Sequence, residues 1–340
     1  MRDLVVAGGG PLGLATALYA ARSGLDVVVR EPRQGVIDKA CGEGLMPAAV
    51  AELLKLGVRI EGHPIDGIRY VDGTGVAEAR FRNGPGRGVP RTDLHRALRE
   101  AVTVAGIPVE HRPVLTIEQR GDHALVDGER TRHLVAADGL HSPVRRQLGL
   151  DARSRVARRY GQRCHVATPP WTRFVEVHWS AAAEAYVTPV GKDRIGVALL
   201  SSQRRPFREL LDTFPTLGPR LDGLPVSKAR GAGPLRQRSR RRVAGRVLLV
   251  GDAAGYVDAL TGEGIALGLA QARAAVAAVS AGDPGRYERD WRRLTWRHNL
   301  LTQGLLAATR HRPVRTRIVS AAAALPSVFE VAVNQLARPA

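Results

Sequence analysis

The sequence of 340 residues predicts an α/β fold, in which a parallel sheet carries an inserted antiparallel sheet and a helical C-terminal tail. Three observations lead to this prediction. A glycine-rich turn joins two apolar runs within residues 5–31, and alternating apolar residues recur through 160–200. The segment GRVLLVGDAAG at 245–255 then restores the pattern of a buried parallel strand.

The segment 5–31 has the pattern of a Rossmann-type strand, turn and helix. A buried strand ends at Ala7, and a helix with apolar residues at helical spacing follows the turn. The second apolar run is a strand that ends at Glu31, eighteen positions beyond Gly13, where a carboxylate that holds an adenosine ribose is expected. The turn itself fits G-x-G-x-x-G, which lets backbone approach a diphosphate. Its candidate binding residues are Gly8, Gly10, Pro11, Leu12 and Gly13.

Composition and charge narrow the possible partners and compartments. The net charge is +19, with 47 arginines and 4 lysines, but no nucleic-acid motif interleaves these residues with aromatics, so we expect no specific nucleic-acid partner. The two cysteines make no disulfide framework, and the first residues do not have the pattern of a signal peptide. No uninterrupted apolar run reaches about 18 residues. We therefore expect a cytoplasmic protein without a membrane span.

Local patterns predict the remaining elements. Residues 91–103 form a helix that Thr92 or Asp93 caps, and short strands follow at 114–119, 123–128 and 133–138 as a meander that returns to the main sheet. From about residue 283 the chain is helical. Its amphipathic last part, Val314 to Leu336, is expected to pack against the nucleotide-binding part, with interfacial lipid contact as the alternative.

Three later motifs make the prediction more specific. Asp138-Gly139 and Gly251-Asp252 each close a predicted strand, and Arg91 opens the predicted helix. Together with the N-terminal turn, this order of motifs resembles the FAD-dependent group 2 oxidoreductases of the p-hydroxybenzoate hydroxylase fold over roughly residues 1–275. The resemblance implies that the parallel sheet belongs to an FAD-binding domain.

The resemblance also implies roles for individual residues. Asp252 would contact the ribityl chain of the flavin, although capping of a helix is an alternative role for this carboxylate. Arg91 would lie near the diphosphate, and Asp138 and Gly139 would contact FAD and a transiently bound NAD(P)H. Gly251 is a further implied cofactor-binding residue. The remaining ones form the turn whose backbone N–H groups would approach the flavin pyrimidine edge, namely Gly262, Glu263, Gly264 and Ile265.

These motifs divide the chain into a discontinuous set of domains. The FAD-binding domain comprises 1–60, 91–150 and 240–280, and the substrate domain comprises 61–90 and 151–239. Residues 281–340 form the helical C-terminal region. The substrate is expected to lie between the two domains.

Residues 38–47, DKACGEGLMP, follow the ribose-binding acid where the resembled family runs a loop toward the flavin. Cys41 is a candidate catalytic residue, as a proton donor or redox partner, or else a small residue packed in a turn. Tyr186, in AYVTPVG, either orients a substrate or packs in its strand. Glu43 and His63 are further candidates. We expect no metal ligand among these residues.

The resemblance leaves three functions open. The first is an NAD(P)H-dependent monooxygenase of a polyketide- or phenol-like secondary metabolite, similar to the flavoproteins that accompany type III polyketide synthases. The second is a geranylgeranyl reductase-like enzyme that saturates prenyl or polyene double bonds, and the Cys41-Gly42 pair resembles that branch. The third is a basic FAD-binding protein without turnover. The expected partner is a hydrophobic or aromatic small molecule, contact with a membrane surface or an acyl carrier remains open, and no oligomeric state is predicted.

Overall fold

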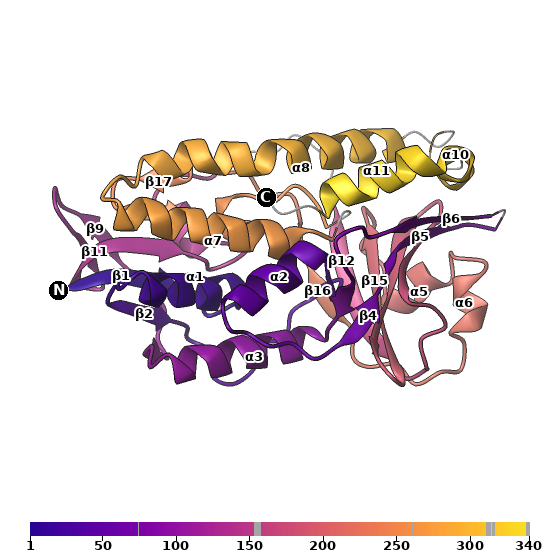
Figure 1. Cartoon of the computed structure of the whole chain (residues 1–340), viewed down its shortest axis with the longest axis horizontal. Helices are drawn as coiled ribbons and strands as arrows, with labels where there is room; N and C mark the ends of the chain where they lie inside the picture. Colours follow the sequence, from indigo (N-terminus) through magenta and orange to yellow (C-terminus); the bar gives the residue numbers. More distant parts are fainter. Residues whose placement is uncertain (74, 153–157, 260–261, 311–313, 315–316, 338–340) are drawn as a thin grey trace.

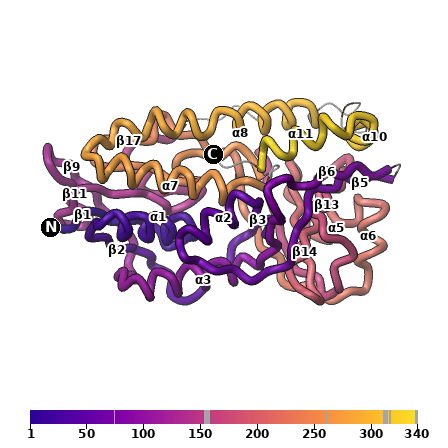
Figure 2. Tube along the Cα trace, in the orientation of Figure 1, coloured from indigo at the N-terminus to yellow at the C-terminus, as the bar shows by residue number. Residues whose placement is uncertain are grey.

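The chain forms the α/β fold that the sequence predicts, seen here in a computed structural model. Figures 1 and 2 show two sheets side by side along the long axis of the molecule, with the C-terminal helices lying across both. The residues that the structure describes are 1–73, 75–152, 158–259, 262–310, 314 and 317–337.

The larger sheet is mainly parallel. Within the described residues it has eight strands, ordered β17-β18-β11-β1-β2-β8, with β10 and β9 added beside β11. The five strands β18, β11, β1, β2 and β8 are parallel to their neighbours in this series, and β9, β10 and β11 form the expected meander. The bounds are β1 Arg2–Ala7, β2 Val27–Arg30, β8 Val109–Glu110, β9 Ile117–Gln119, β10 Ala124–Val126, β11 Glu129–Ala136, β17 Val243–Ala244 and β18 Val247–Leu249.

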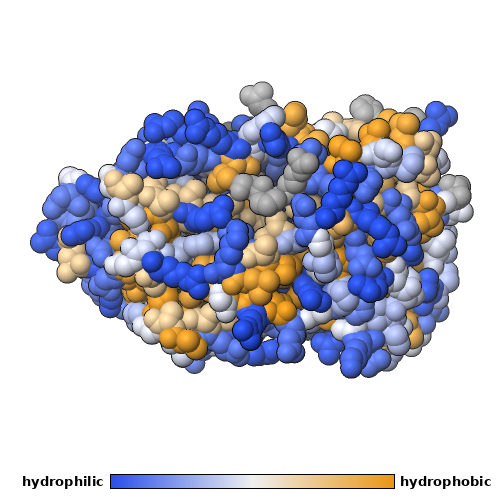
Figure 3. Space-filling view, viewed as in Figure 1, coloured by the Kyte–Doolittle hydropathy of each residue, from blue (hydrophilic) through white to orange (hydrophobic). Residues whose placement is uncertain are grey.

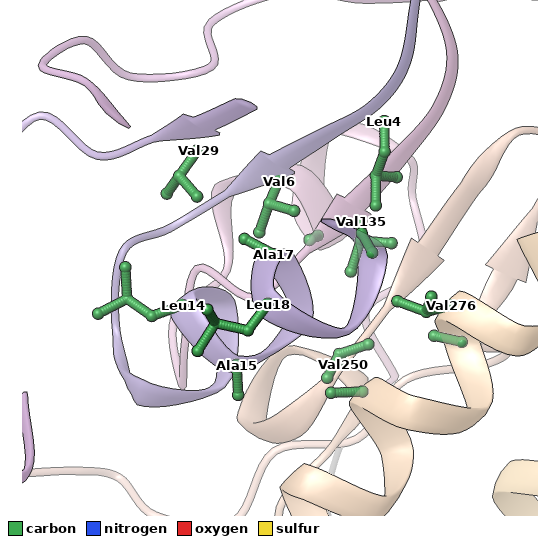
Figure 4. Packing of buried hydrophobic residues seen from close by; sticks show 14 of the residues in the cluster. Leu4, Val6, Leu14, Ala15, Ala17, Leu18, Val29, Val135, Val250 and Val276 are labelled. Atoms are coloured by element: carbon green, nitrogen blue, oxygen red, sulfur yellow. The ribbon is translucent and has the colours of Figure 1, made fainter. Parts of the chain in front are cut away.

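Small side chains allow the helices to pack closely on this sheet. Ala15, Ala17 and Ala20 of α1 are fully buried. Figure 4 shows Ala17 facing Val6 of β1 in the core cluster, which also includes residues of β11 and α7. The helices and helical turns are α1 Pro11–Arg22, α2 Pro47–Lys55, α3 Arg91–Val104, α4 Pro143–Gln147, α5 Phe207–Leu211, α6 Leu217–Arg220, η1 Gly251–Ala254, α7 Gly264–Ser280, α8 Arg286–Arg310, α10 Ile318–Ala324 and α11 Pro326–Leu336.

The second sheet combines two distant segments of the chain. In the described part of the chain it has seven strands, ordered β16-β12-β15-β14-β13-β5-β6, and only the β13–β5 pair is parallel among these neighbours. Its strands are β5 Gly67–Val71, β6 Val76–Arg80, β12 Tyr160–Val166, β13 Phe174–Trp179, β14 Ala183–Gly191, β15 Arg194–Ser201 and β16 Arg230–Ala232.

A small sheet connects the two larger ones. It contains β3 Gly44–Leu45, β7 Gly86–Gly88 and β4 His63–Ile65. Gly88 lies so close to the carbonyl oxygen of Pro189 in β14 that a Cβ would overlap it. This contact places β7, and β3 that pairs with it, against β14 of the second sheet.

The sequence led us to expect that the C-terminal helices pack on the nucleotide-binding part. They also pack on the second sheet. Helix α8 lies along α7, but α11 packs on β6 of the second sheet, where Phe329 and Val333 meet Ala77 and Ala79. Among the described helices, none is by itself long and apolar enough to cross a membrane. Only α10 and α11 taken together reach that length and composition, and they are bent by 106°.

The predicted N-cap of α3 differs from the one in the structure, so that prediction is wrong. Pro90, rather than Thr92 or Asp93, occupies the N-cap position and provides no capping side chain. Instead, the backbone N–H of Arg91 donates to Oε1 of Glu43 at 2.8 Å. The capping carboxylate comes from the loop before β3, so local sequence around residue 91 did not reveal it.

Candidate active site

The three glycines of the N-terminal turn have different structural roles. Gly8 has a φ of 102°, which other residues rarely adopt. Gly13 packs so tightly on the carbonyl oxygen of Gly8 that any side chain would clash, and it does not line the cavity described below. Gly10 has ordinary backbone angles, and a Cβ added there would have only an Arg91 guanidinium nitrogen, 4.0 Å away, within 4 Å. The space in front of Gly10 is therefore open to a ligand.

The carboxylate of Glu31 holds this turn in place. Its Oε2 accepts a hydrogen bond from the Gly9 N–H at 2.8 Å, and Arg33 Nε donates to its Oε1 at 2.7 Å. Burial opposes ionisation, but the hydrogen bonds from Arg33 and Gly9 outweigh it and keep the pKa of Glu31 below its usual value. The Glu31 carboxylate is therefore ionised beside the turn and lines the cavity.

His95 fixes the other side of the turn, and sequence analysis missed it. Its Nδ1 accepts from the Ile37 N–H at 3.3 Å, which leaves Nε2 as the donor to the Gly9 carbonyl at 2.8 Å. Burial lowers the pKa of His95, so the neutral ring is favoured. The only available signal was a polar residue on the buried side of the predicted helix 91–103.

Charged groups with unused hydrogen-bonding atoms gather in front of the parallel strands. Nε of Arg91 and Oδ1 of Asp138 are buried, and in the described part of the chain they have no hydrogen-bond partner. Asp252 lies in η1 and faces the same cavity, and burial raises its pKa despite the nearby cations Lys39 and Arg91. No side-chain cap closes η1. These groups converge where a polar ligand would complete their hydrogen bonds.

Some residues of the second glycine-rich turn line the cavity, and others contact neighbouring elements instead. Gly262, Gly264 and Ile265 line the cavity, and α7 begins at Gly264, so its N-terminal end lies at the cavity wall. Glu263 does not line it, because its Oε2 pairs with Nδ1 of His298 in α8 at 2.9 Å. Gly251 packs against Leu12 and also lies outside the lining. Pro11, Leu12 and Gly139 are lining residues.

The loop of residues 38–44 reaches from the first sheet to the second. At one end, Nζ of Lys39 lies beside Gly139. At the other, Thr188 of β14 donates to the Gly42 carbonyl at 2.8 Å. Cys41 lies between these contacts and lines the cavity. Burial raises the pKa of its thiol, and the nearby Arg91 offsets this only in part, so Cys41 stays protonated at neutral pH.

Glu43 anchors this loop from a strained position. It has a φ of 60° although it is not glycine, and its side chain is fully buried. Besides capping α3, it pairs through Oε2 with Nε2 of His165 at 2.7 Å. The neighbouring Arg163 pairs with Asp38 at the start of the loop. His63, by contrast, lies outside the cavity, with Nδ1 3.0 Å from the Pro64 carbonyl oxygen.

The second sheet supplies an apolar wall. The strands contribute alternate residues, because every second side chain of a strand points to the same face. Tyr186 is among them, and burial raises its pKa well above the usual value, as it raises that of Tyr70 to about 12, so both phenols keep their protons. The lining residues of β5, β13, β14 and β15 are Ile68, Tyr70, Val175, Val177, Tyr186, Thr188, Ala198 and Leu200, and Leu305, Val333 and Leu336 join them from α8 and α11. Strand β12 of the same sheet adds the polar residues Gln162 and Arg163 to the lining.

The resulting cavity of about 800 Å³ extends from the glycine turn to the apolar wall. Its polar end fits a dinucleotide: the space at Gly10 suits a diphosphate, Glu31 can accept ribose hydroxyls, and Asp252 can accept ribityl hydroxyls. Arg91 and Asp138 retain the buried unpaired atoms that such a ligand would use. The donor set therefore fits FAD.

Comparisons with known proteins agree with this arrangement. The model of the FAD binding domain family matches residues 1–200. Menaquinone reductase of Mycolicibacterium smegmatis is 32% identical, over 87% of this chain and 80% of that protein. Digeranylgeranylglycerophospholipid reductase 1 of Methanothermobacter thermautotrophicus is 28% identical, over 84% of this chain and 81% of that protein.

A solved structure extends the likeness to the fold. The flavoprotein/dehydrogenase of Cytophaga hutchinsonii superimposes with a TM-score of 0.76 at 17% identity, covering 86% of this chain and 82% of that one. At this identity the likeness concerns the fold alone. The family match and the relatives together show that this chain belongs to the FAD-binding-domain family of group 2 oxidoreductases and is an FAD-dependent oxidoreductase.

Proposed function

We propose that the protein is a reductase that saturates a carbon–carbon double bond in an isoprenoid chain, with NAD(P)H as the source of electrons. The observation that carries the proposal is the protonated thiol of Cys41, placed in the loop that joins the polar and apolar parts of the cavity. A proton donor at this position is what the reduction of an unactivated double bond requires besides a hydride.

The apolar wall favours an isoprenoid substrate. Its strand residues offer methyl groups, methylenes and the aromatic faces of Tyr70 and Tyr186, and its helical residues Leu305, Val333 and Leu336 are aliphatic. An isoprenoid chain is itself made of methyl and methylene groups with isolated double bonds, so it can replace water along such a wall. The protonated phenols add no charge to this part of the cavity.

The residues of the chain account for the proton in the reaction. The chemistry that bound, reduced FAD would supply is a hydride for one carbon of the double bond. Cys41 would give its Sγ proton to the other carbon, and the resulting thiolate would take a proton from water. The hydride and the proton together add two hydrogens, and NAD(P)H is oxidised in the overall reaction. The high pKa of the Cys41 thiol favours the return of this proton after each turnover.

The relatives support a reductase rather than an oxygen-inserting enzyme. One is named for menaquinone and the other for digeranylgeranylglycerophospholipids, and these two classes of molecule share isoprenoid chains. The monooxygenase of a phenol-like metabolite, which the sequence placed first, stays a prediction. It differs from the reductase in requiring O₂ as a substrate.

The experiment compares products with and without oxygen. The purified holoenzyme is incubated with NADH or NADPH and a geranylgeranyl lipid that lacks a quinone, and products are analysed by mass spectrometry. We expect anaerobic gain of two hydrogens per reduced bond. Cys41→Ala should slow this reaction by about 10²- to 10⁴-fold, the usual contribution of a positioned acid. Cys164→Ala is the matched control, because Cys164 is buried in β12 and lies outside the cavity lining.

The outcomes separate the candidate functions. Addition of an oxygen atom, with consumption of O₂ and no anaerobic product, would replace the reductase by the monooxygenase. FAD that no nicotinamide or substrate can reduce or reoxidise would indicate a binding protein. If Cys41→Ala and Cys164→Ala reduce the lipid equally fast, Cys41 is not the proton donor.

A further inference from the structure

The large exposed apolar side chains of the described residues are concentrated in the C-terminal helices. Trp296, Leu300 and Leu301 lie on the outer side of α8, and Leu325, Val328 and Val331 lie on α11 and its start, with exposed fractions from 38% to 63%. Figure 3 shows hydrophobic residues on this side of the molecule, toward α10 and α11. We call these six residues the C-terminal apolar face.

The surface around α10 and α11 lacks the usual charges of an exposed helix. The sequence from Ile318 to Phe329, IVSAAAALPSVF, contains no charged residue. Glu330, which follows it, pairs with Arg82 of the loop after β6 at 3.2 Å. Exposed helices of a globular protein ordinarily carry a charged face, so this uncharged surface is suited to contact with an apolar phase.

Positive charge borders the apolar face on one side. The outward side of α8 presents Arg289, Arg292 and Arg293 before Trp296, the first residue of the apolar face, and Arg297 directly after it. Arg289 and Arg292 also pair with Asp283 and Glu288. Arg297 extends over the ring of Trp296, with its guanidinium carbon 5.2 Å from the ring centroid. A basic helix face next to Trp and Leu is the arrangement that binds the headgroup region of an anionic bilayer.

The same helices form part of the cavity wall. Leu305 of α8 and Val333 and Leu336 of α11 line the cavity, while their outward residues form the apolar face. Phe329 packs on Tyr70, itself a lining residue, with ring centroids 4.6 Å apart. Only one layer of helices therefore separates the apolar face from the substrate end of the cavity.

We propose that the C-terminal apolar face binds the surface of an anionic lipid bilayer, with the arginines of α8 at the headgroups and α10 and α11 in the interfacial layer. The part of this proposal in which the bound protein takes its substrate directly from the bilayer rests on the proposed function. Water-insoluble isoprenoid chains reside in the bilayer, so docking there shortens their path to the cavity.

A second copy of the chain is a less suitable occupant of this face. In a two-fold symmetric dimer this face would meet a copy of itself, and the charged border of that copy is also basic. Such a partner offers the arginines of α8 no acidic surface. An anionic bilayer instead neutralises them, which is why we favour it.

The test is sedimentation with vesicles of phosphatidylcholine alone or mixed with phosphatidylglycerol. The variant Leu325→Asp/Val328→Asp places two carboxylates in the apolar face. The matched control, Val104→Asp/Leu115→Asp, makes the same change of charge at residues that are at least as exposed but lie at the end of α3 and before β9. Neither pair lines the cavity.

We expect the parent and the control to bind the mixed vesicles, and the apolar-face variant to bind about tenfold or more weakly, because inserted apolar area is lost. Arg292→Gln/Arg293→Gln should bind mixed vesicles more weakly but still bind better than to phosphatidylcholine alone. Equal binding by the apolar-face variant and its control would overturn the proposal. Loss of a dimer, measured by light scattering, in that variant alone would assign the face to a second copy instead.

A second measurement separates this proposal from the proposed function. With substrate dispersed in detergent, the apolar-face variant should turn over at the parent rate, and with substrate in vesicles it should be slower. Parent protein that binds vesicles but reduces no isoprenoid lipid would sink the proposed function and leave the docking surface intact.

Discussion

The polar and apolar ends of the cavity are built from different parts of the chain. At the polar end, turns after parallel strands present backbone at Gly8 and Gly10, with a few carboxylates such as Glu31 and Asp252. At the apolar end, alternate side chains of an antiparallel sheet form a continuous wall. A site made of backbone needs particular residue types at particular spacings, whereas a wall needs only apolar residues of suitable volume.

The difference determines how each end of the cavity tolerates substitution. A Cβ at Gly13 would overlap the Gly8 carbonyl, so a change there disrupts helix–strand packing. At Ala198 or Val177, other apolar side chains would still pack and would change only the shape of the wall. The polar end is therefore restricted in residue type, whereas the apolar end accepts other apolar residues.

The largest expected effect is on cofactor binding at Gly10. Gly10→Val should abolish FAD binding while the protein stays folded, because the added side chain fills the space in front of the turn and meets no backbone. Ala198→Val, which also adds bulk to the cavity but at the apolar end, should retain FAD and alter substrate preference. In both variants, flavin absorbance measures the bound FAD and circular dichroism measures the folded state. FAD bound by Gly10→Val as tightly as by the parent would show that the diphosphate lies elsewhere.

A smaller effect is expected at Asp252. Asp252→Ala should weaken FAD binding by roughly ten- to a hundredfold, the value of a hydrogen bond to a charged group of about 1.5–3 kcal/mol. The fold should persist, since no side-chain cap closes η1. Tyr186→Phe removes a hydroxyl from the apolar end and should leave the FAD affinity unchanged. Titration of the two apoprotein variants with FAD measures both affinities. An equal loss of FAD affinity in the two variants would contradict the division between the polar and apolar ends of the cavity.

The smallest effect concerns pH, and it arises in the parallel sheet. Burial lowers the pKa of His133 in β11 from 6.5 to about 4, with Arg246 contributing. Between these values the unfolded state binds more protons than the folded state, so His133 favours folding above pH 6.5 and loses this contribution as the pH falls toward 4. A change from pH 7 to pH 5 should lower the free energy of unfolding by up to about 2 kcal/mol.

Denaturant unfolding at several pH values measures this loss. His133→Gln should show a weaker pH dependence, whereas His111→Gln, at an exposed histidine, should behave as the parent does. Identical pH dependence in all three proteins would exclude His133 as the source.

The sequence by itself determined the parallel-sheet fold and the family, because glycine spacing and strand–turn–helix order are local properties. It also indicated Cys41, which lines the cavity. The role it gave to Glu263, a backbone contact with the flavin, stays a prediction, and the structure pairs the side chain of this residue with His298 in α8.

Only the tertiary structure decided the contacts between distant segments. It brought Glu43 to the N-terminus of α3 and to His165, set His95 under the Gly9 carbonyl, and placed α11 on β6. None of these contacts follows from local periodicity, because each joins residues that become neighbours only when the sheets assemble. The apolar wall has the same origin: alternate apolar residues predict a strand, but the pairing of the strands decides which side chains share a cavity.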